Sequence, residues 1–272
     1  GERPSHPELL DWLATEFLQS GWNMKRLHRL IVTSATYRQN AVVSPSQLDK
    51  DPNNRWLAHF PRQRLEAEAI RDVAMCVSGL LHTQVGGPSV FPYQPPGLWE
   101  QVAFEGTRSW EQNLSKGADN YRRGLYVYWR RSIPYASFVT FDAPSRETCT
   151  ARRPRTNTPL QALALLNDPV YVEAARGLGY RIMQKGGSTA PDRVKYAFRV
   201  CLGRNPSETE LDRMTKAFEK EMEHFLQHRA DANQLVNIGA TPPPTNVDVV
   251  ELAAWTMIGQ VLLNIDETIT KG

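Results

Sequence analysis

Apolar residues recur every three or four positions along most of this chain, which is the spacing of amphipathic α-helices. The first such stretch opens with Ser5, Pro7 and Glu8, a capping-box pattern that predicts a helix start. Gly21 ends that helix, and Asn23 caps a second one. Because the link between them is so short, the pattern predicts a helical hairpin.

A longer helix is predicted over residues 62–81, where apolar positions mark one buried stripe. Its charged residues alternate in sign, as on a solvated helix face with ion pairs. Glu66 and Glu68 are two positions apart and point to different faces, so a paired-carboxylate site is not expected there. Before this helix, the polar residues 40–54 predict a surface loop.

The C-terminal half is predicted to be helical as well. Thr158 starts a helix that Asp168 and Pro169 interrupt before it continues to about Met183. Further helices are predicted at residues 194–202, 207–227 and 247–269. The proline-rich residues 229–246 are expected to form a loop.

Residues 82–137 lack a helical pattern and are rich in proline, glycine and aromatic side chains. The aromatic side chains either cover the edge of the core or stack on a flat ligand; they are Tyr93, Trp99, Phe104 and Trp110. Residues 124–130 have an alternating pattern with aromatic and β-branched side chains and are the best strand candidate. We therefore predict a mainly α fold, a multi-helix domain with an irregular aromatic and proline-rich insertion and at most a small β element. Its parts are a helical region 1–81, the irregular insertion 82–137, and a central polar loop with helices 138–272.

Composition excludes several classes of protein. Hydrophobic residues make up 41% and charged residues 22%, as in soluble globular proteins. No apolar run approaches the roughly 20 residues that span a bilayer. The net charge of +3 is too small to indicate a nucleic-acid partner. The chain opens on Gly1 rather than Met, and we expect it to be a fragment of a longer protein.

The three cysteines are far apart and form no CxxC or CxxCH motif, so no c-type haem attaches to this part of the protein. Cys76 and Cys201 fall on apolar helix faces and are expected to be buried free thiols. Cys149 lies in a polar loop, where arginines could lower its pKa, but no histidine is near to act as a base. His224 and His228 share a helix face, and no metal site is predicted.

The central segment carries the candidate chemistry. Arg152, Arg153 and Arg155 have planar, permanently charged groups that suit carboxylate, sulfate or phosphate. Asp142 is the candidate catalytic base. In the alternative interpretation, Asp142 and Glu147 pair with these arginines and only fasten a long loop. The other candidate ligand-binding residues are Tyr128, Trp129, Asn157 and Gln161.

Several short sequence segments, spread over nearly the whole chain, resemble segments of one known family and occur in the same order. They are HPELLDWLA (6–14), LHRLIVTSATYR (27–38), RLEAEAIRD (64–72), FDAP (141–144), TPLQAL (158–163) with LND (166–168), and VLLNIDE (261–267). The chain is similar to domain-of-unknown-function family 1553, the C-terminal domain that accompanies cytochrome c domains in large planctomycete proteins. The family has no established catalytic residues to carry over.

The resemblance implies a context for this domain. A secretion signal, a cytochrome c-like domain and a second planctomycete-specific domain would precede it, so haem c is expected on another domain and none in this fragment. The location would be periplasmic or extracellular. Two functions follow: the substrate side of a haem-linked oxidoreductase acting on a carbohydrate, or a non-catalytic helical module that docks the cytochrome domain or a glycan.

Overall fold

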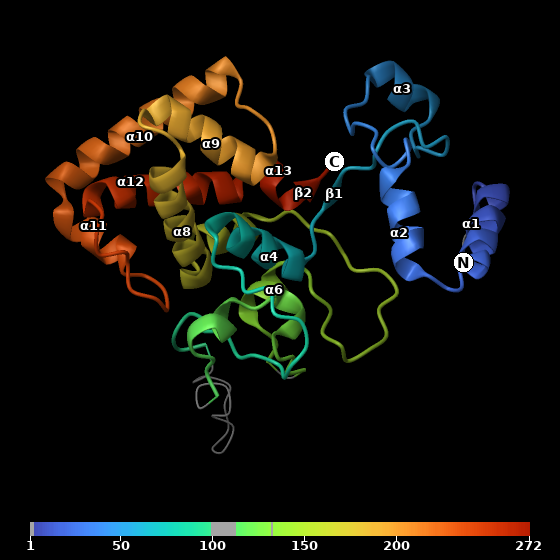
Figure 1. Ribbon diagram of the computed structural model, residues 1–272, viewed down its shortest axis with the longest axis horizontal. Coiled ribbons are helices and arrows are strands. Elements are labelled where there is room, and N and C mark those ends of the chain that lie inside the picture. The colour runs from blue at the N-terminus through green and yellow to red at the C-terminus, as the bar shows by residue number, and fades with distance from the viewer. Residues whose placement is uncertain (1–2, 99–112, 132) are drawn as a thin grey trace. The chain divides into compact units, whose positions relative to one another are not determined.

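Helices carry most of the chain in the computed structural model, which describes residues 3–98, 113–131 and 133–272 (Figure 1). This confirms the predicted mainly helical fold. The chain divides into an N-terminal unit, Gly1–Gln63 with Thr270–Gly272, and a C-terminal unit, Arg64–Ile269. No helix in the described part of the chain is long and apolar enough to cross a membrane.

The N-terminal unit contains the predicted hairpin. Its helices are α1 (Pro7–Gln19), α2 (Met24–Thr33) and α3 (Pro45–Lys50). The Asn23 side chain accepts a hydrogen bond from the backbone N–H of Arg26, which confirms the predicted cap of α2. The capping box at Ser5 is wrong, because His6 occupies the N-cap position and the Ser5 hydroxyl bonds to its ring instead.

The predicted surface loop at residues 40–54 lies at the surface, but it contains the helix α3, which the sequence pattern did not predict. Ser44 and Gln47 form a complete capping box, with Pro45 in the first turn. Local chemistry of this strength starts even a helix of six residues.

The C-terminal unit is built from helices of very different length. They are α4 (Ala67–Ser78), α6 (Ala136–Thr140), α7 (Pro159–Asn167), α8 (Pro169–Lys185), α9 (Ala190–Leu202), α10 (Glu208–Gln227), α11 (Arg229–Val236), α12 (Val249–Asn264) and α13 (Asp266–Ile269). The short 3₁₀ turns are η1 (Gly117–Tyr121) and η2 (Gly124–Tyr126). The two-residue strands β1 (Gln63–Arg64) and β2 (Thr270–Lys271) pair with each other.

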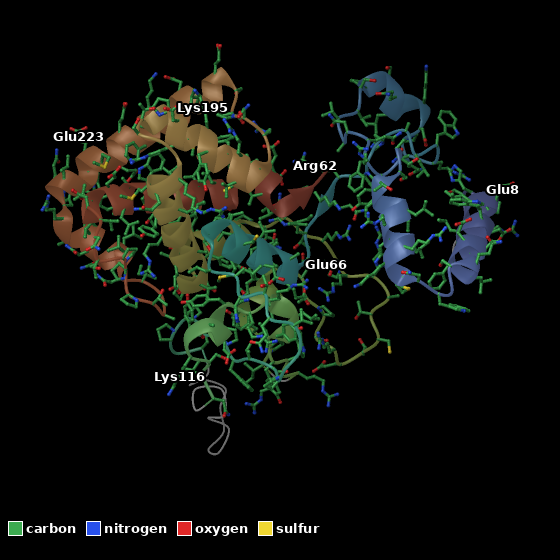
Figure 2. The ribbon with its side chains drawn as sticks, in the orientation of Figure 1. Glu8, Arg62, Glu66, Lys116, Lys195 and Glu223 are labelled. Carbon is green, nitrogen blue, oxygen red and sulfur yellow. The ribbon has the colours of Figure 1, made fainter. Side chains whose placement is uncertain are left out.

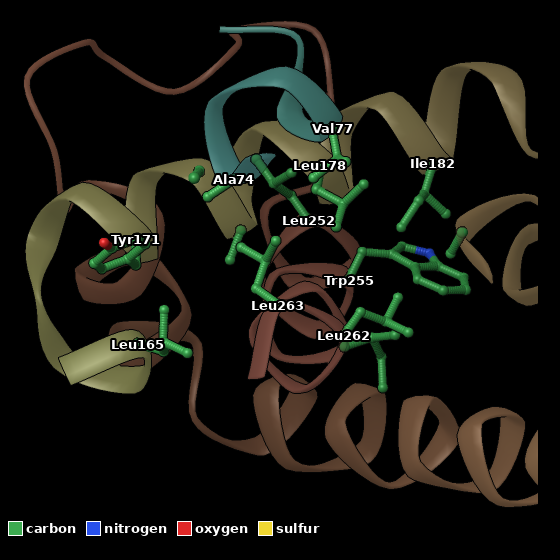
Figure 3. Close-up of a cluster of buried hydrophobic side chains, with 14 of the residues drawn as sticks. Ala74, Val77, Leu165, Tyr171, Leu178, Ile182, Leu252, Trp255, Leu262 and Leu263 are labelled. Carbon is green, nitrogen blue, oxygen red and sulfur yellow. The ribbon is translucent and has the colours of Figure 1, made fainter. Parts of the chain in front are cut away.

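The core is centred on α12, which crosses α8 and packs against it (Figure 3). Trp255 of α12 is fully buried, and the ring of Phe218 stacks on it with centroids 4.1 Å apart. A Cβ at Gly179 would lie 3.0 Å from the Trp255 backbone, and one at Gly259 would lie 2.7 Å from the carbonyl oxygen of Ala175. The two helices therefore approach closely because each has a glycine at the contact.

Three predicted segments have different boundaries in the structure. The helix expected at 62–81 is the shorter α4, since Glu66 is extended at the N-cap position and Gly79 takes a left-handed φ of 82° at the C-terminal end. The loop expected at 229–246 begins with α11, whose Ala232 and Val236 are four residues apart and both buried. The predicted final helix stops at Asn264, and α13 follows it.

The strand predicted at residues 124–130 is wrong. Gly124 starts the 3₁₀ turn η2, and Val127 makes only an isolated bridge to Val90. A Cβ at Gly124 would lie 2.9 Å from Cβ of Glu68, so this glycine allows the turn to pack directly on α4. Of the aromatic residues noted in the insertion, Tyr93 is described, whereas Trp99, Phe104 and Trp110 lie outside the described residues.

The completely buried Glu173 of α8 joins the irregular segments to the core. The hydroxyl groups of Tyr93 and Tyr121 donate to its carboxylate, as do the backbone N–H groups of Ala240 and Thr241, each at 3.0 Å. Arg176 adds an ion pair at 3.1 Å. Burial alone would raise the pKa of Glu173, but these hydrogen bonds outweigh burial and lower it.

Replacing Glu173 by Ala is expected to lower the free energy of unfolding of the C-terminal unit by about 3–5 kcal/mol, because the buried Arg176 loses its ion-pair partner and the hydroxyls of Tyr93, Tyr121 and Thr241 lose an acceptor. Denaturant unfolding followed by circular dichroism measures the change. Glu219→Ala, at an exposed position of α10, is the control and should cost less than about 0.5 kcal/mol. Equal losses for the two variants would contradict the role of Glu173.

Candidate functional site

Asp142 follows α6 and fastens the loop that spans residues 143–157. Its φ of 61° is left-handed, a conformation that aspartate tolerates better than most residues. Its carboxylate accepts hydrogen bonds from the Thr156 backbone N–H at 2.7 Å and from the Thr156 hydroxyl at 2.8 Å. The two ends of the loop are therefore held together by Asp142.

Gln161 supports the same contact from α7. Its side chain is fully buried, and the chain folds it inward because Thr158 and Gln161 form a capping box. The Gln161 amide donates to the Thr140 carbonyl at 3.0 Å, to the Thr156 hydroxyl at 3.1 Å and to Asp142 at 3.4 Å. The predicted start of a helix at Thr158 is confirmed, and its cap also positions the loop.

Arg153 makes a forked ion pair, but not with the partners that the sequence suggested. Its guanidinium donates to Glu68 at 2.6 and 3.2 Å, and Glu66 lies 3.4 Å away. The expected pairing with Asp142 or Glu147 is wrong. Glu66 stands at the extended N-cap, at the start of α4 (Figure 2). The geometry of a continuous helix therefore does not separate Glu66 from Glu68, and both reach Arg153.

These residues surround a narrow pocket, which we call the arginine pocket. It is lined by Arg64, Leu65, Glu66, Phe141, Asp142, Arg153, Pro154, Arg155 and Gln161. Four of the candidate site residues, Asp142, Arg153, Arg155 and Gln161, thus come together.

Arg64 is the lining residue that sequence reasoning missed. Its Nε is buried without a hydrogen-bond partner, and it forms no ion pair within the described residues. Burial lowers the pKa of Arg64, and the nearby charge of Asp142 only partly opposes this. An unpaired, half-buried guanidinium in a pocket favours an anion.

The remaining candidate residues do not line the arginine pocket. Tyr128 stacks on Phe91 at 4.7 Å, and Trp129 stacks over Phe138 at 6.3 Å while donating to the Ser145 carbonyl. Both rings thus contribute to packing around the insertion. The last two, Arg152 and Asn157, are exposed on the loop.

The cysteines and histidines form no site of their own. All three cysteines are free, and the prediction of a buried Cys76 is wrong, since its position on α4 faces solvent. Burial raises the pKa of Cys201 to about 12, so this thiol stays protonated. The rings of His224 and His228 stack 4.5 Å apart, but no group of three or more metal-ligating side chains occurs among the described residues.

Asp168, at the start of α8, is a half-buried carboxyl group with a raised pKa. It caps α8 by accepting a hydrogen bond from the Val170 N–H at 2.9 Å. Burial raises its pKa to about 6, although the Val170 N–H and the charge of Arg71 act in the opposite direction. Arg71 itself is completely buried and donates to the Asn120 and Arg122 carbonyls at 2.6 and 2.7 Å.

A model of the family PSD1, described as a protein of unknown function (DUF1553), matches residues 1–218. The chain belongs to the PSD1 family. This confirms the resemblance to domain-of-unknown-function family 1553. No curated protein and no solved structure matches the chain.

The half-buried Asp168 makes the stability of this PSD1 domain dependent on pH. A raised pKa means that the folded state binds the proton more tightly, so stability is lost as the pH rises from about 3.8 through about 6. Asparagine caps a helix as well as aspartate but does not titrate. The unfolding free energy of Asp168→Asn relative to wild type should therefore rise by about 2–3 kcal/mol between pH 4 and pH 7.

Urea unfolding at each pH unit measures this difference. The matched control is Asp248→Asn, because Asp248 caps α12 with the same bond to a backbone N–H, at 2.7 Å, but is exposed. The difference between that variant and wild type should not change with pH in the same direction. A flat profile for Asp168→Asn would refute the burial effect.

Proposed function

We propose that this chain is a non-catalytic helical binding module whose arginine pocket holds the carboxylate or sulfate of an acidic saccharide. The observation that carries the proposal is the unpaired guanidinium of Arg64 in the pocket wall. The charge of Arg153 is already neutralised by its ion pairs with Glu66 and Glu68. Arg64 and the exposed Arg155 thus supply the attraction for an anion.

The size of the pocket limits which part of a ligand enters. Its interior admits a group about as large as one water molecule. One oxygen of a carboxylate or sulfate has this size, whereas a sugar ring stays outside. The exposed amide of Asn157, two residues from Arg155, offers hydrogen bonds to hydroxyl groups there.

The wider context of this proposal comes from the family resemblance. We propose a secreted parent protein in which a cytochrome c-like domain, carrying haem c, and a planctomycete-specific domain precede the PSD1 domain. In that arrangement the module brings a saccharide to the neighbouring domains. Docking of the cytochrome c-like domain itself is a related role for the same helical scaffold.

A second candidate function is that of the substrate side of a haem-linked oxidoreductase. It is favoured by the position of Asp142, which lines the same pocket as Arg153 and Arg155 and could accept a proton from a bound sugar. Against it, Thr156 and Gln161 already donate to the Asp142 carboxylate. The non-catalytic role therefore agrees better with the geometry.

Mutation of the pocket tests the binding role. We expect Arg64→Met and Arg155→Ser each to weaken binding of glucuronate or of a sulfated disaccharide at least about tenfold, since a charged hydrogen bond contributes about 1.5–3 kcal/mol. Calorimetric titration of the 272-residue chain measures the dissociation constants. Arg152→Ser is the matched control, an exposed arginine of the same loop outside the pocket.

The three variants separate specific binding from general attraction to a basic loop. Unchanged binding by Arg152→Ser, with weaker binding by the other two, supports the pocket. Equal weakening by all three would show a non-specific contact and refute the proposal. Absence of any saturable binding to wild type would do the same.

Replacing Asp142 by Asn in the full-length parent protein tests the oxidoreductase role. Asparagine also tolerates a left-handed backbone and can accept the Thr156 hydrogen bonds, so the loop should stay closed. If Asp142 is the base, saccharide-dependent reduction of the haem, followed in its visible spectrum, should fall at least about 100-fold. Turnover equal to that of wild type would remove Asp142 from this role.

A further inference from the structure

The helical hairpin of the N-terminal unit exposes most of its large apolar side chains. Neither α1 nor α2 contains a buried residue. The exposed ones, each 37–66% accessible, are Leu9, Leu10, Trp12, Leu18, Trp22, Met24, Ile31 and Val32. Apolar surface of this extent, flanked by charged residues, is typical of a protein interaction site.

The contact between the two helices uses other residues. A crevice between them is lined by Glu16, Phe17, Ser20, Arg26, Leu27 and Leu30. Arg26 and Glu16 form an ion pair at 3.6 Å across it. The Phe17 ring meets the edge of Trp22 at 5.1 Å in the turn that follows α1.

Each helix also carries an apolar stripe outside that crevice. Leu9 and Trp12 are three residues apart on one side of α1, and Met24 and Ile31 are seven residues apart on one side of α2. None of the four lines the crevice. The hairpin can therefore pack against a further pair of helices without losing its own contact.

The charges of the hairpin are divided between its helices. α1 carries three acidic residues and no basic one, namely Glu8, Asp11 and Glu16. α2 carries three lysine or arginine residues and no acidic one, namely Lys25, Arg26 and Arg29. Glu8 projects from α1 (Figure 2), and within the described residues the ion pair of Glu16 with Arg26 is the only one that these six form.

We propose that a second copy of this chain covers the hairpin, with α1 of each protomer lying against α2 of its partner. A two-fold contact requires a surface that is complementary to itself, and an acidic helix beside a basic one has that property. The apolar stripes would form the centre of the interface and the opposite charges its rim. A partner whose surface carries charges of only one sign would be complementary to only one of the two helices.

The length of the helices is sufficient for such a contact. At about 1.5 Å per residue, helices of 13 and 10 residues are about 20 and 15 Å long. Four of them make a small antiparallel bundle, the arrangement in which amphipathic helices bury a shared core. The inference concerns a surface far along the sequence from the arginine pocket and does not depend on saccharide binding.

The mass of the chain in solution tests the proposal, measured by light scattering after size exclusion. Wild type is expected at twice 30.8 kDa. One variant, Lys25→Glu with Arg29→Glu, makes both helices acidic, and a second, Glu8→Lys with Asp11→Lys, makes both basic. Each alone should dimerise at least about tenfold more weakly, because like charges then face each other. An equimolar mixture should recover the dimer, since acidic helices again meet basic ones.

A charge-matched control and the recovery in the mixture separate docking from misfolding. Arg213→Glu with Lys220→Glu, two exposed positions of α10, should leave the dimer unchanged. High salt should reduce the difference between the hairpin variants, because it screens exposed charges. A monomeric wild type overturns the proposal, as does a dimer that both hairpin variants retain or a mixture that stays monomeric.

Discussion

The buried carboxylate of Glu173 is the interaction on which the irregular half of the C-terminal unit depends. A charge in the protein interior is costly unless hydrogen bonds and an opposite charge surround it. The required donors come from three separate segments: Tyr93, Tyr121 and the turn at Ala240 and Thr241. These segments have little secondary structure of their own, so the carboxylate and the loops stabilise each other. The position of Glu173 is in turn fixed by the close packing of α8 on α12.

A carboxylate also holds the loop after α6 by accepting hydrogen bonds, but the charges around this loop are paired less completely. Asp142 holds both ends of the loop, and Arg153 ties it to α4 through Glu68. Glu173 forms an ion pair with Arg176, whereas Arg64 in the second network forms no ion pair within the described residues, and its buried Nε has no hydrogen-bond partner. A half-buried cation of this kind is better suited to an external anion than to structure alone. This difference is the reason to propose a binding site at the arginine pocket rather than at the more deeply buried Glu173.

The sequence predicted features that depend on residues close together in the chain, such as helix caps. Asn23 caps α2 and Thr158 caps α7 because the partners of each cap lie within a few residues. Contacts across long separations were not predictable: Arg153 meets Glu68 across 85 positions, and no periodicity signals such a pair. The strand predicted at residues 124–130 failed for the same reason: Gly124 packs on α4 at the start of a 3₁₀ turn, and Val127 finds only an isolated bridge to Val90, contacts that the alternating pattern does not signal.

The two units differ in how they bury apolar surface. The C-terminal unit encloses a core around Trp255, while the side chains that would form a core in the hairpin of the N-terminal unit lie at its surface. Helices of 13 and 10 residues are only marginally stable in water unless tertiary packing supports them. The stability of this hairpin is therefore linked to whatever covers it, because any partner that binds only the folded form adds its binding free energy. Folding of the N-terminal unit is then thermodynamically coupled to its association with a partner.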